Sequence, residues 1–157
     1  MAKGGPELLR DPVAQELLAS TIPARLAYNW TDGSPRVVAI WFHWNGTDIV
    51  MATLPGAPKL KALHTGDRVA ITIDSNEPPH HVLTIRGTAD VTEAEGVVPE
   101  YAQAATRYLG KQLGEAYVES LPADLRMGRI AVRPDHVVVL DFQTRFPSAV
   151  SSLRSGS

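Results

Sequence analysis

Short segments with strand character, joined by tight turns, run through most of this chain and constrain its fold more than any other feature. In "RVVAIWFHWNGTDIVMATL", residues 36–44 and 48–54 are rich in β-branched and aromatic residues and flank the turn sequence Asn45–Gly46, so they are expected to pair as a hairpin. Strands are also expected at residues 24–30, 68–74, 82–93 and 128–142, the last interrupted by a turn at Pro134–Asp135. Such short connections favour antiparallel pairing.

Three segments have helical character. Residues 11–20 are expected to form a short helix, because Asp11 can cap it and Pro12 suits the first helical position. One or two turns are expected at "PKLKALHTG", and a longer helix at residues 99–121, whose middle is weakened by Gly110 and Gly114. The pattern predicts a β-rich α+β fold of about six strands, for which a small barrel is the natural arrangement.

The 157 residues suit one domain, and the segment from about 148 to 157 is expected to be a flexible tail. A net charge of −2 gives no global attraction to nucleic acid or to anionic membranes. The chain has no cysteine, which excludes disulfides and thiol catalysis. It shows neither a signal peptide nor a membrane-spanning apolar run, so we expect a cytoplasmic protein without nucleic-acid or membrane partners.

Two lysines, Lys59 and Lys61, lie where the turn "LPGAP" becomes a helix. Free backbone N–H groups at a helix start, together with lysine charges, suit a phosphate group. Thr53 at the end of the preceding strand offers a hydroxyl, and Arg36 offers a further cation. The alternative is that the lysines are simply solvated.

Other chemistry has little support in the sequence. The five histidines lack the spacing of a metal site, and no nucleophile elbow, paired carboxylates or dinucleotide-binding glycine motif is present. No metal site is therefore expected, and no catalytic residue is identified. Aromatic residues near Trp41 either stack on a flat ligand or pack in the core.

The order and spacing of "PRVVAIWFHWNGTDIVMATLPGAPKLKALHTGDRVAITID" and "LTIRGTADV" resemble the pyridoxamine-phosphate-oxidase-like split β-barrel superfamily, in particular its flavin/deazaflavin oxidoreductase B group. The resemblance covers roughly residues 20–142. It implies an α+β, mainly β fold: a six-stranded antiparallel split β-barrel of the Greek key type with a few helices. It also implies a homodimer with a flavin-type cofactor in a groove at the dimer interface.

By the same resemblance, the strand that begins at Arg36 runs along the cofactor ring, with backbone contacts near Val38, Ala39 and Ile40. Lys59 and Lys61 bind the cofactor phosphate, and Thr53 and Arg36 help to anchor the phosphate and the cofactor tail. Leu60, between the two lysines, is a further cofactor-binding position. Tyr28, Trp41 and His81 are candidates to shape the substrate pocket. The proton donor is solvent or His81.

The Arg- and Trp-rich C-terminal segment of full pyridoxamine phosphate oxidases has no counterpart in "DFQTRFPSAVSSLRSGS". This departure favours coenzyme F-420 over FMN. The expected function is hydride transfer between reduced F-420 and an unsaturated small organic acceptor. An FMN-dependent oxidase or reductase, and a carrier that binds a cofactor or tetrapyrrole without catalysis, are the alternatives.

Overall fold

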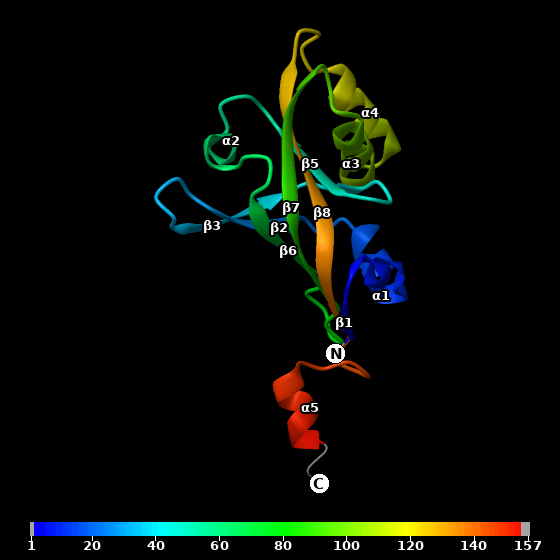
Figure 1. The fold of residues 1–157 in the computed structure, drawn as a ribbon. Helices are drawn as coiled ribbons and strands as arrows, with labels where there is room; N and C mark the ends of the chain where they lie inside the picture. The colour runs from blue at the N-terminus through cyan, green and yellow to red at the C-terminus, as the bar shows by residue number, and fades with distance from the viewer. Residues whose placement is uncertain (1, 155–157) are drawn as a thin grey trace.

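The computed structural model describes residues 2–154 and shows one antiparallel sheet with the strand order β3-β2-β6-β7-β8-β5-β4, with β1 added to β8 (Figure 1). The strands are β1 (Ala2–Gly4), β2 (Ala24–Asn29), β3 (Pro35–Ile40), β4 (His43–Trp44), β5 (Ile49–Thr53), β6 (Arg68–Asp74), β7 (Val82–Glu95) and β8 (Arg126–Leu140). The helices are the 3-10 helix η1 (Pro6–Arg10), α1 (Pro12–Leu18), α2 (Pro58–Ala62), α3 (Pro99–Leu109), α4 (Lys111–Glu119) and α5 (Ser148–Arg154).

The sheet curls because β3 and β4, at opposite ends of the strand order, are joined by two residues only, Trp41 and Phe42. A connection this short spans on the order of 10 Å. The two end strands must therefore come close together, yet they do not pair with each other. The result is an open, split barrel, as predicted, in a mainly β, α+β fold.

Within residues 2–154, the sheet has eight strands rather than the expected six. One additional strand is β1, and the other arises because the predicted strand 36–44 is broken at Trp41 and Phe42. The Phe42 side chain is fully buried, and its carbonyl oxygen accepts a hydrogen bond from Arg107 instead of a strand partner. The predicted hairpin with residues 48–54 is consequently reduced to two residue pairs, between β4 and β5.

The two longest strands, β7 and β8, pair along their whole length and form the spine of the sheet (Figure 1). The turn predicted at Pro134–Asp135 is wrong, because β8 runs through it. The register instead shifts at Arg86 and Gly87, where Gly87 lies opposite Pro134. This β-bulge absorbs the proline, which cannot donate to the ladder.

Gly87→Ala is expected to lower the free energy of unfolding by about 2–3 kcal/mol. A Cβ atom at Gly87 would overlap the carbonyl oxygen of Arg133 and would lie 2.9 Å from a methyl of Val132. Urea unfolding measures the change, with Thr92→Ala, an exposed position on the same strand, as a control within about 0.5 kcal/mol of wild type. An unchanged midpoint for Gly87→Ala would contradict the close packing of β7 on β8.

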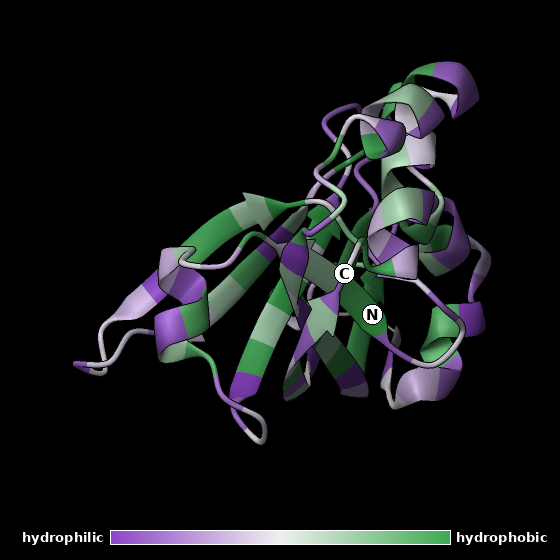
Figure 2. Ribbon diagram, turned by 90° about the horizontal axis from the view of Figure 1, so that it is seen from above, coloured by the Kyte–Doolittle hydropathy of each residue, from purple (hydrophilic) through white to green (hydrophobic). Residues whose placement is uncertain are grey.

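The core lies inside the curled sheet, on the side covered by η1 and α1. Alternate residues of β2, β6 and β7 are buried, and Figure 2 shows green and purple bands alternating along the strands. Leu9, Leu17 and Leu18 from η1 and α1 pack into the same cluster. The period-two burial explains why the strand segments could be recognised in the sequence.

The helix predicted at residues 99–121 is divided into α3 and α4 at Gly110, whose φ is +84°. This confirms the weak point expected there. Gly114 has a different role, because a Cβ at this position would lie 2.6 Å from the Cα of Thr106. The absence of a side chain lets α4 pack closely against α3.

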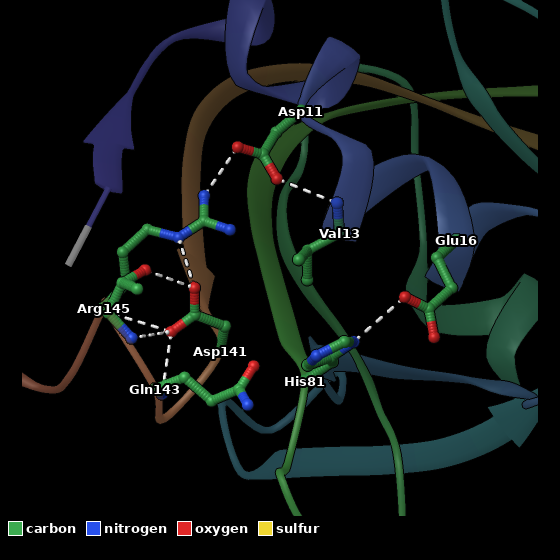
Figure 3. Close-up of polar contacts among 8 residues, drawn as sticks. Asp11, Val13, Glu16, His81, Asp141, Gln143 and Arg145 are labelled. Atoms are coloured by element: carbon green, nitrogen blue, oxygen red, sulfur yellow. Dashed lines mark hydrogen bonds and ion pairs between the residues drawn. The ribbon is translucent and has the colours of Figure 1, made fainter.

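A cluster of charged residues ties the end of β8 to the start of α1 (Figure 3). As predicted, Asp11 caps α1, and its carboxylate accepts from the Val13 N–H at 2.9 Å. The Arg145 guanidinium lies between Asp11 (2.5 Å) and Asp141 (3.1 Å). The buried Asp141 carboxylate also accepts from the backbone N–H groups of Gln143, Thr144 and Arg145, at 2.7–2.9 Å.

Within the segment predicted to be a flexible tail, residues 148–154 form α5, which extends beyond the sheet (Figure 1). Residues 155–157 lie outside the described residues. Across residues 2–154, no helix has the length and apolar character needed to cross a membrane.

Candidate functional site

The strand β5, the turn after it and α2 place Thr53 and Leu60 next to each other. Thr53 pairs with Gly128 of β8 across the sheet. The Leu60 side chain packs on the same glycine, where a Cβ would lie 2.5 Å from a Leu60 methyl. A left-handed residue, Gly56 (φ +81°), turns the chain back over the sheet before Pro58 begins the helix. Gly128 is therefore the position at which α2 packs on the sheet, through the Leu60 side chain.

The two lysines of α2 differ in their surroundings. Lys59 is partly buried, and burial lowers the pKa of its ammonium group. Lys61 is exposed. Among residues 2–154, neither side chain has a hydrogen-bond or ion-pair partner. Positions two apart on a helix point to different sides, so Lys59 is the better placed of the two to hold an anionic group against the protein.

Hollows lie on either side of α2. One, of about 320 Å³, adjoins the turn before the helix and is lined by Pro55, Gly56, Leu60, Val91, Thr92, Glu93 and Gly128. The other, of about 410 Å³, lies between the end of α2 and the β2–β3 turn and is lined by Asn29, Trp30, Thr31, Ala62, Leu63, His64, Asp67 and Arg68. Figure 1 shows α2 beside the outer end of β2 and β3. A ligand at α2 therefore has space on two sides.

Arg36 lies on the β3 side of this region, and its guanidinium stacks over the Trp30 ring at 5.0 Å. Trp30 lines the hollow next to α2, whereas Arg36 lines a third groove together with Arg68 and Arg86. Neither Lys59 nor Lys61 lines any of these three cavities. A shared phosphate site of Arg36 with Lys59 and Lys61 stays a prediction.

The segment Val38–Ile40 lies on an edge strand. In the part of the chain that the structure describes, β3 pairs with β2 alone, so its second edge carries backbone N–H and C=O groups without ladder partners. The β3 side chains are mostly exposed, and Val37 is 67% exposed. Backbone groups at such an edge can hydrogen-bond to the polar rim of a planar ring, which is the role predicted for Val38, Ala39 and Ile40.

The residues predicted for a substrate pocket lie in three different surroundings. Tyr28 is 7% exposed and lines the groove of Arg36. Trp41 stacks on Tyr108 with ring centroids 5.0 Å apart. The Nδ1–H of His81 donates a hydrogen bond to the Glu16 carboxylate of α1 at 3.1 Å (Figure 3). None of the three cavities described above is lined by all three residues, so their common role stays a prediction.

Two arginines occupy positions near these elements that local sequence patterns do not indicate. Arg107 of α3 donates to the carbonyl oxygen of Ser20 at 2.9 Å and to that of Phe42. Arg68 lines both the hollow at the end of α2 and the groove of Arg36. Their charge was visible in the sequence, but their targets lie 20 or more positions away along the chain. Within residues 2–154, no three His, Cys, Asp or Glu side chains are grouped as metal ligands.

Comparisons with known proteins agree with this fold. A family model described as pyridoxamine 5'-phosphate oxidase matches residues 11–141. Solved structures with the same fold include an F-420 reductase (TM-score 0.57, 23% identity, 79% of this chain and 94% of that chain). Another is a conserved hypothetical protein from Mycobacterium tuberculosis (TM-score 0.61, 16% identity, 82% of this chain and 82% of that chain). A third is the heme storage protein HutZ from Vibrio cholerae (TM-score 0.56, 18% identity, 82% of this chain and 94% of that chain). Among curated proteins, none matches the sequence.

Proposed function

Because the chain belongs to the pyridoxamine 5'-phosphate oxidase family, we propose that it is an oxidoreductase that binds a flavin-type cofactor at α2 and β3. The proposed cofactor is coenzyme F-420, with FMN as the alternative. The bound cofactor supplies the hydride chemistry, and the proposed reaction is hydride transfer to or from an unsaturated small organic molecule. The residues of this chain bind and orient the reactants.

The observation that carries the proposal is the state of Lys59. A partly buried ammonium group without a carboxylate partner is costly, unless a ligand supplies the opposite charge. Lys59 lies on a helix seated next to Thr53, whose hydroxyl can donate to a phosphate oxygen. These residues fit an anionic phosphate group, and Leu60 holds the helix in place by packing on Gly128.

The edge of β3 supports the second part of the proposal. Its free backbone groups can hold the polar rim of the cofactor ring and leave one ring face open to the substrate. No side chain near this edge is identified as a general acid, so solvent is proposed as the source of the proton. We also propose that two copies of the chain form a homodimer with the cofactor between them, which would cover the exposed Val37.

Lys59→Ala is expected to weaken the binding of F-420 about tenfold, because a charge-assisted hydrogen bond to phosphate is lost. Isothermal titration with F-420 and with FMN, side by side, measures the effect. The matched control is Lys111→Ala, an exposed lysine of α4, which should bind like wild type. Equal affinity of Lys59→Ala and wild type would contradict the phosphate site.

Catalysis is tested separately from binding. Reduced F-420 is incubated with the protein and a panel of enones, quinones and tetrapyrroles, and its oxidation is followed by absorbance. Turnover that falls in Lys59→Ala supports the reductase. Saturable binding without turnover on any acceptor would reject the reductase and favour the carrier.

The carrier is kept as a second candidate because a structural neighbour is a heme storage protein by name. It predicts that heme binds in a saturable manner and gives a shifted Soret band. A carrier needs no hydride acceptor. Its affinity for heme should therefore be the same with and without the enones and quinones of the acceptor panel.

A further inference from the structure

A groove that shares no lining residue with the hollows beside α2 lies between η1 and the turn that joins β4 to β5. Its volume is about 520 Å³, which is within the range of pockets that hold small molecules. The residues that line this groove, which we call the η1 groove, are Pro6, Glu7, Leu9, Arg10, Gln15, Trp44, Gly46, Thr47 and Arg133. Because none of them belongs to α2 or β3, the η1 groove is separate from the proposed cofactor site.

Two residues of η1 bring opposite charges to the η1 groove. Glu7 and Arg10 are three positions apart, and such positions lie on the same side of a 3-10 helix, about 6 Å apart along its axis. Within residues 3–153, neither side chain forms an ion pair, with the other or with a third residue. A carboxylate and a guanidinium are therefore neighbours in the η1 groove, and both are available to a ligand.

The Glu7 carboxylate is held in place by the two glycines that precede η1. Its Oε1 accepts a hydrogen bond from the Gly5 N–H at 2.8 Å. Backbone hydrogen bonds, from Glu7 itself and then from Gly5, lower the pKa of the carboxyl group. A Cβ atom at Gly4 or at Gly5 would lie 2.7 Å from one of the carboxylate oxygens, so the glycines leave the room that the carboxylate occupies. The anionic side of the η1 groove is therefore preorganised.

The Gln15 amide and the Trp44 ring form further walls of the η1 groove. Gln15 donates through Nε2 to the carbonyl oxygen of Leu9 at 2.5 Å, which places its side chain against η1 and leaves its amide oxygen as an acceptor. Trp44 is partly buried and packs on the core cluster that contains Leu9, so its ring gives the groove an apolar wall. The guanidinium of Arg133 is already paired with Asp48.

We propose that the η1 groove binds a free amino acid with an aromatic side chain, in its zwitterionic form. The α-ammonium group donates to the Glu7 carboxylate and to the Gln15 amide oxygen. The α-carboxylate accepts from Arg10, whose guanidinium presents paired N–H donors to two oxygen atoms. Because both groups are attached to one carbon atom, they suit two charges that lie about 6 Å apart along a 3-10 helix. The aromatic side chain packs on Trp44. A simple anion or amine would leave one of the two charged residues without a partner.

The test compares three probes by isothermal titration: L-phenylalanine, phenylpropionate, which lacks the ammonium group, and phenethylamine, which lacks the carboxylate. Wild type is expected to bind one L-phenylalanine per chain. It should bind each of the other two probes about tenfold more weakly, because the hydrogen bonds of one charged group are lost. Equal affinity for all three probes, or no saturable binding of L-phenylalanine, would overturn the proposal.

Two substitutions should separate the probes. Arg10→Ala is expected to weaken the binding of L-phenylalanine and phenylpropionate about tenfold and to leave that of phenethylamine unchanged. Glu7→Gln, whose amide oxygen can still accept from the Gly5 N–H, should weaken the binding of L-phenylalanine and phenethylamine but not that of phenylpropionate. The matched controls Arg86→Ala and Glu115→Gln, at exposed positions outside the η1 groove, should bind all probes like wild type. Unchanged affinity of Arg10→Ala for L-phenylalanine would contradict the proposal.

A last titration separates this proposal from the proposed cofactor site. L-phenylalanine is titrated into Lys59→Ala, where its affinity should equal that of wild type, because Lys59 does not line the η1 groove. Loss of L-phenylalanine binding in this variant would overturn the η1 groove as a separate site. If wild type bound L-phenylalanine but neither F-420 nor FMN, the cofactor site would be rejected and the η1 groove supported.

Discussion

Asp141→Asn is expected to lower the free energy of unfolding at neutral pH by about 3 kcal/mol. The Asp141 carboxylate is 7% exposed and accepts three backbone N–H groups, the Thr144 hydroxyl and the Arg145 guanidinium. The asparagine side chain keeps the shape of aspartate, but its N–H₂ group is itself a donor. It would therefore face donor groups where the carboxylate oxygen accepted hydrogen bonds. It also leaves Arg145 with Asp11 alone.

The same substitution is expected to change the dependence of stability on pH. Burial alone would raise the pKa of Asp141, but the hydrogen bonds from Arg145, Thr144 and Gln143 hold it far below its ordinary value of 3.8. A carboxylate whose pKa is lower in the folded state binds fewer protons there than in the unfolded state. Its contribution is therefore complete above about pH 5, well clear of its ordinary pKa of 3.8, and it is lost as the pH falls through the folded pKa.

Urea unfolding at a series of pH values measures both effects. The difference between wild type and Asp141→Asn should be constant from pH 5 to 7 and should shrink below pH 4. Asp124→Asn, at an exposed position, removes the same charge and should stay within about 0.5 kcal/mol of wild type. If both variants lost the same stability, the effect would be one of net charge and not of the contacts in Figure 3.

Arg107→Met is expected to lower the free energy of unfolding by about 2–3 kcal/mol. Methionine retains the stem but leaves the carbonyl oxygens of Ser20 and Phe42 without their side-chain donor. It also removes the guanidinium stacked 4.8 Å from the centre of the Phe42 ring. Arg126→Met, which breaks an exposed pair with Glu93, is the matched control and should cost less than about 1 kcal/mol.

A second readout shows whether Arg107 acts at the β3–β4 junction. Burial first, and the charge of Arg107 next, lower the pKa of His43. Removal of that charge should raise the His43 pKa toward its ordinary value, which NMR titration of the imidazole signals can follow. An unchanged His43 pKa in a folded Arg107→Met protein would contradict the close approach of the two side chains, 3.4 Å from Nη1 to Nδ1.

Where a local rule decides the structure, the sequence was sufficient to predict it. The alternation in β2 and β6, the Asp11 cap of α1 and the break at Gly110 follow from side-chain periodicity, hydrogen-bond capacity and backbone freedom within a few residues. The register shift at Gly87 belongs to the same class of local feature, because a glycine inside a strand indicates a bulge or a close approach of two backbones.

The predictions that were wrong depend on partners far away in the chain. Residues 36–44 have strand character throughout, yet the strand breaks at Phe42. The reason is that the Phe42 carbonyl oxygen accepts a hydrogen bond from Arg107, 65 positions later, and that the Phe42 ring is buried in the core. β8 continues through Pro134 because Gly87 lies opposite and the register can shift. No window of neighbouring residues contains these contacts.

The candidate site follows the same division. From the sequence alone, the basic residues Lys59 and Lys61 and their position after Thr53 were clear. Only the tertiary structure shows that the two lysines differ in burial. Lys59 is partly buried on α2, which packs on Gly128 through Leu60, whereas Lys61 is exposed to solvent. The tertiary structure also shows that the Arg36 guanidinium stacks on Trp30 and that Arg36 lines a groove together with Arg68 and Arg86. The reason is physical: local chemistry fixes which groups are available, but burial and charge pairing are set by segments that meet only when the sheet curls.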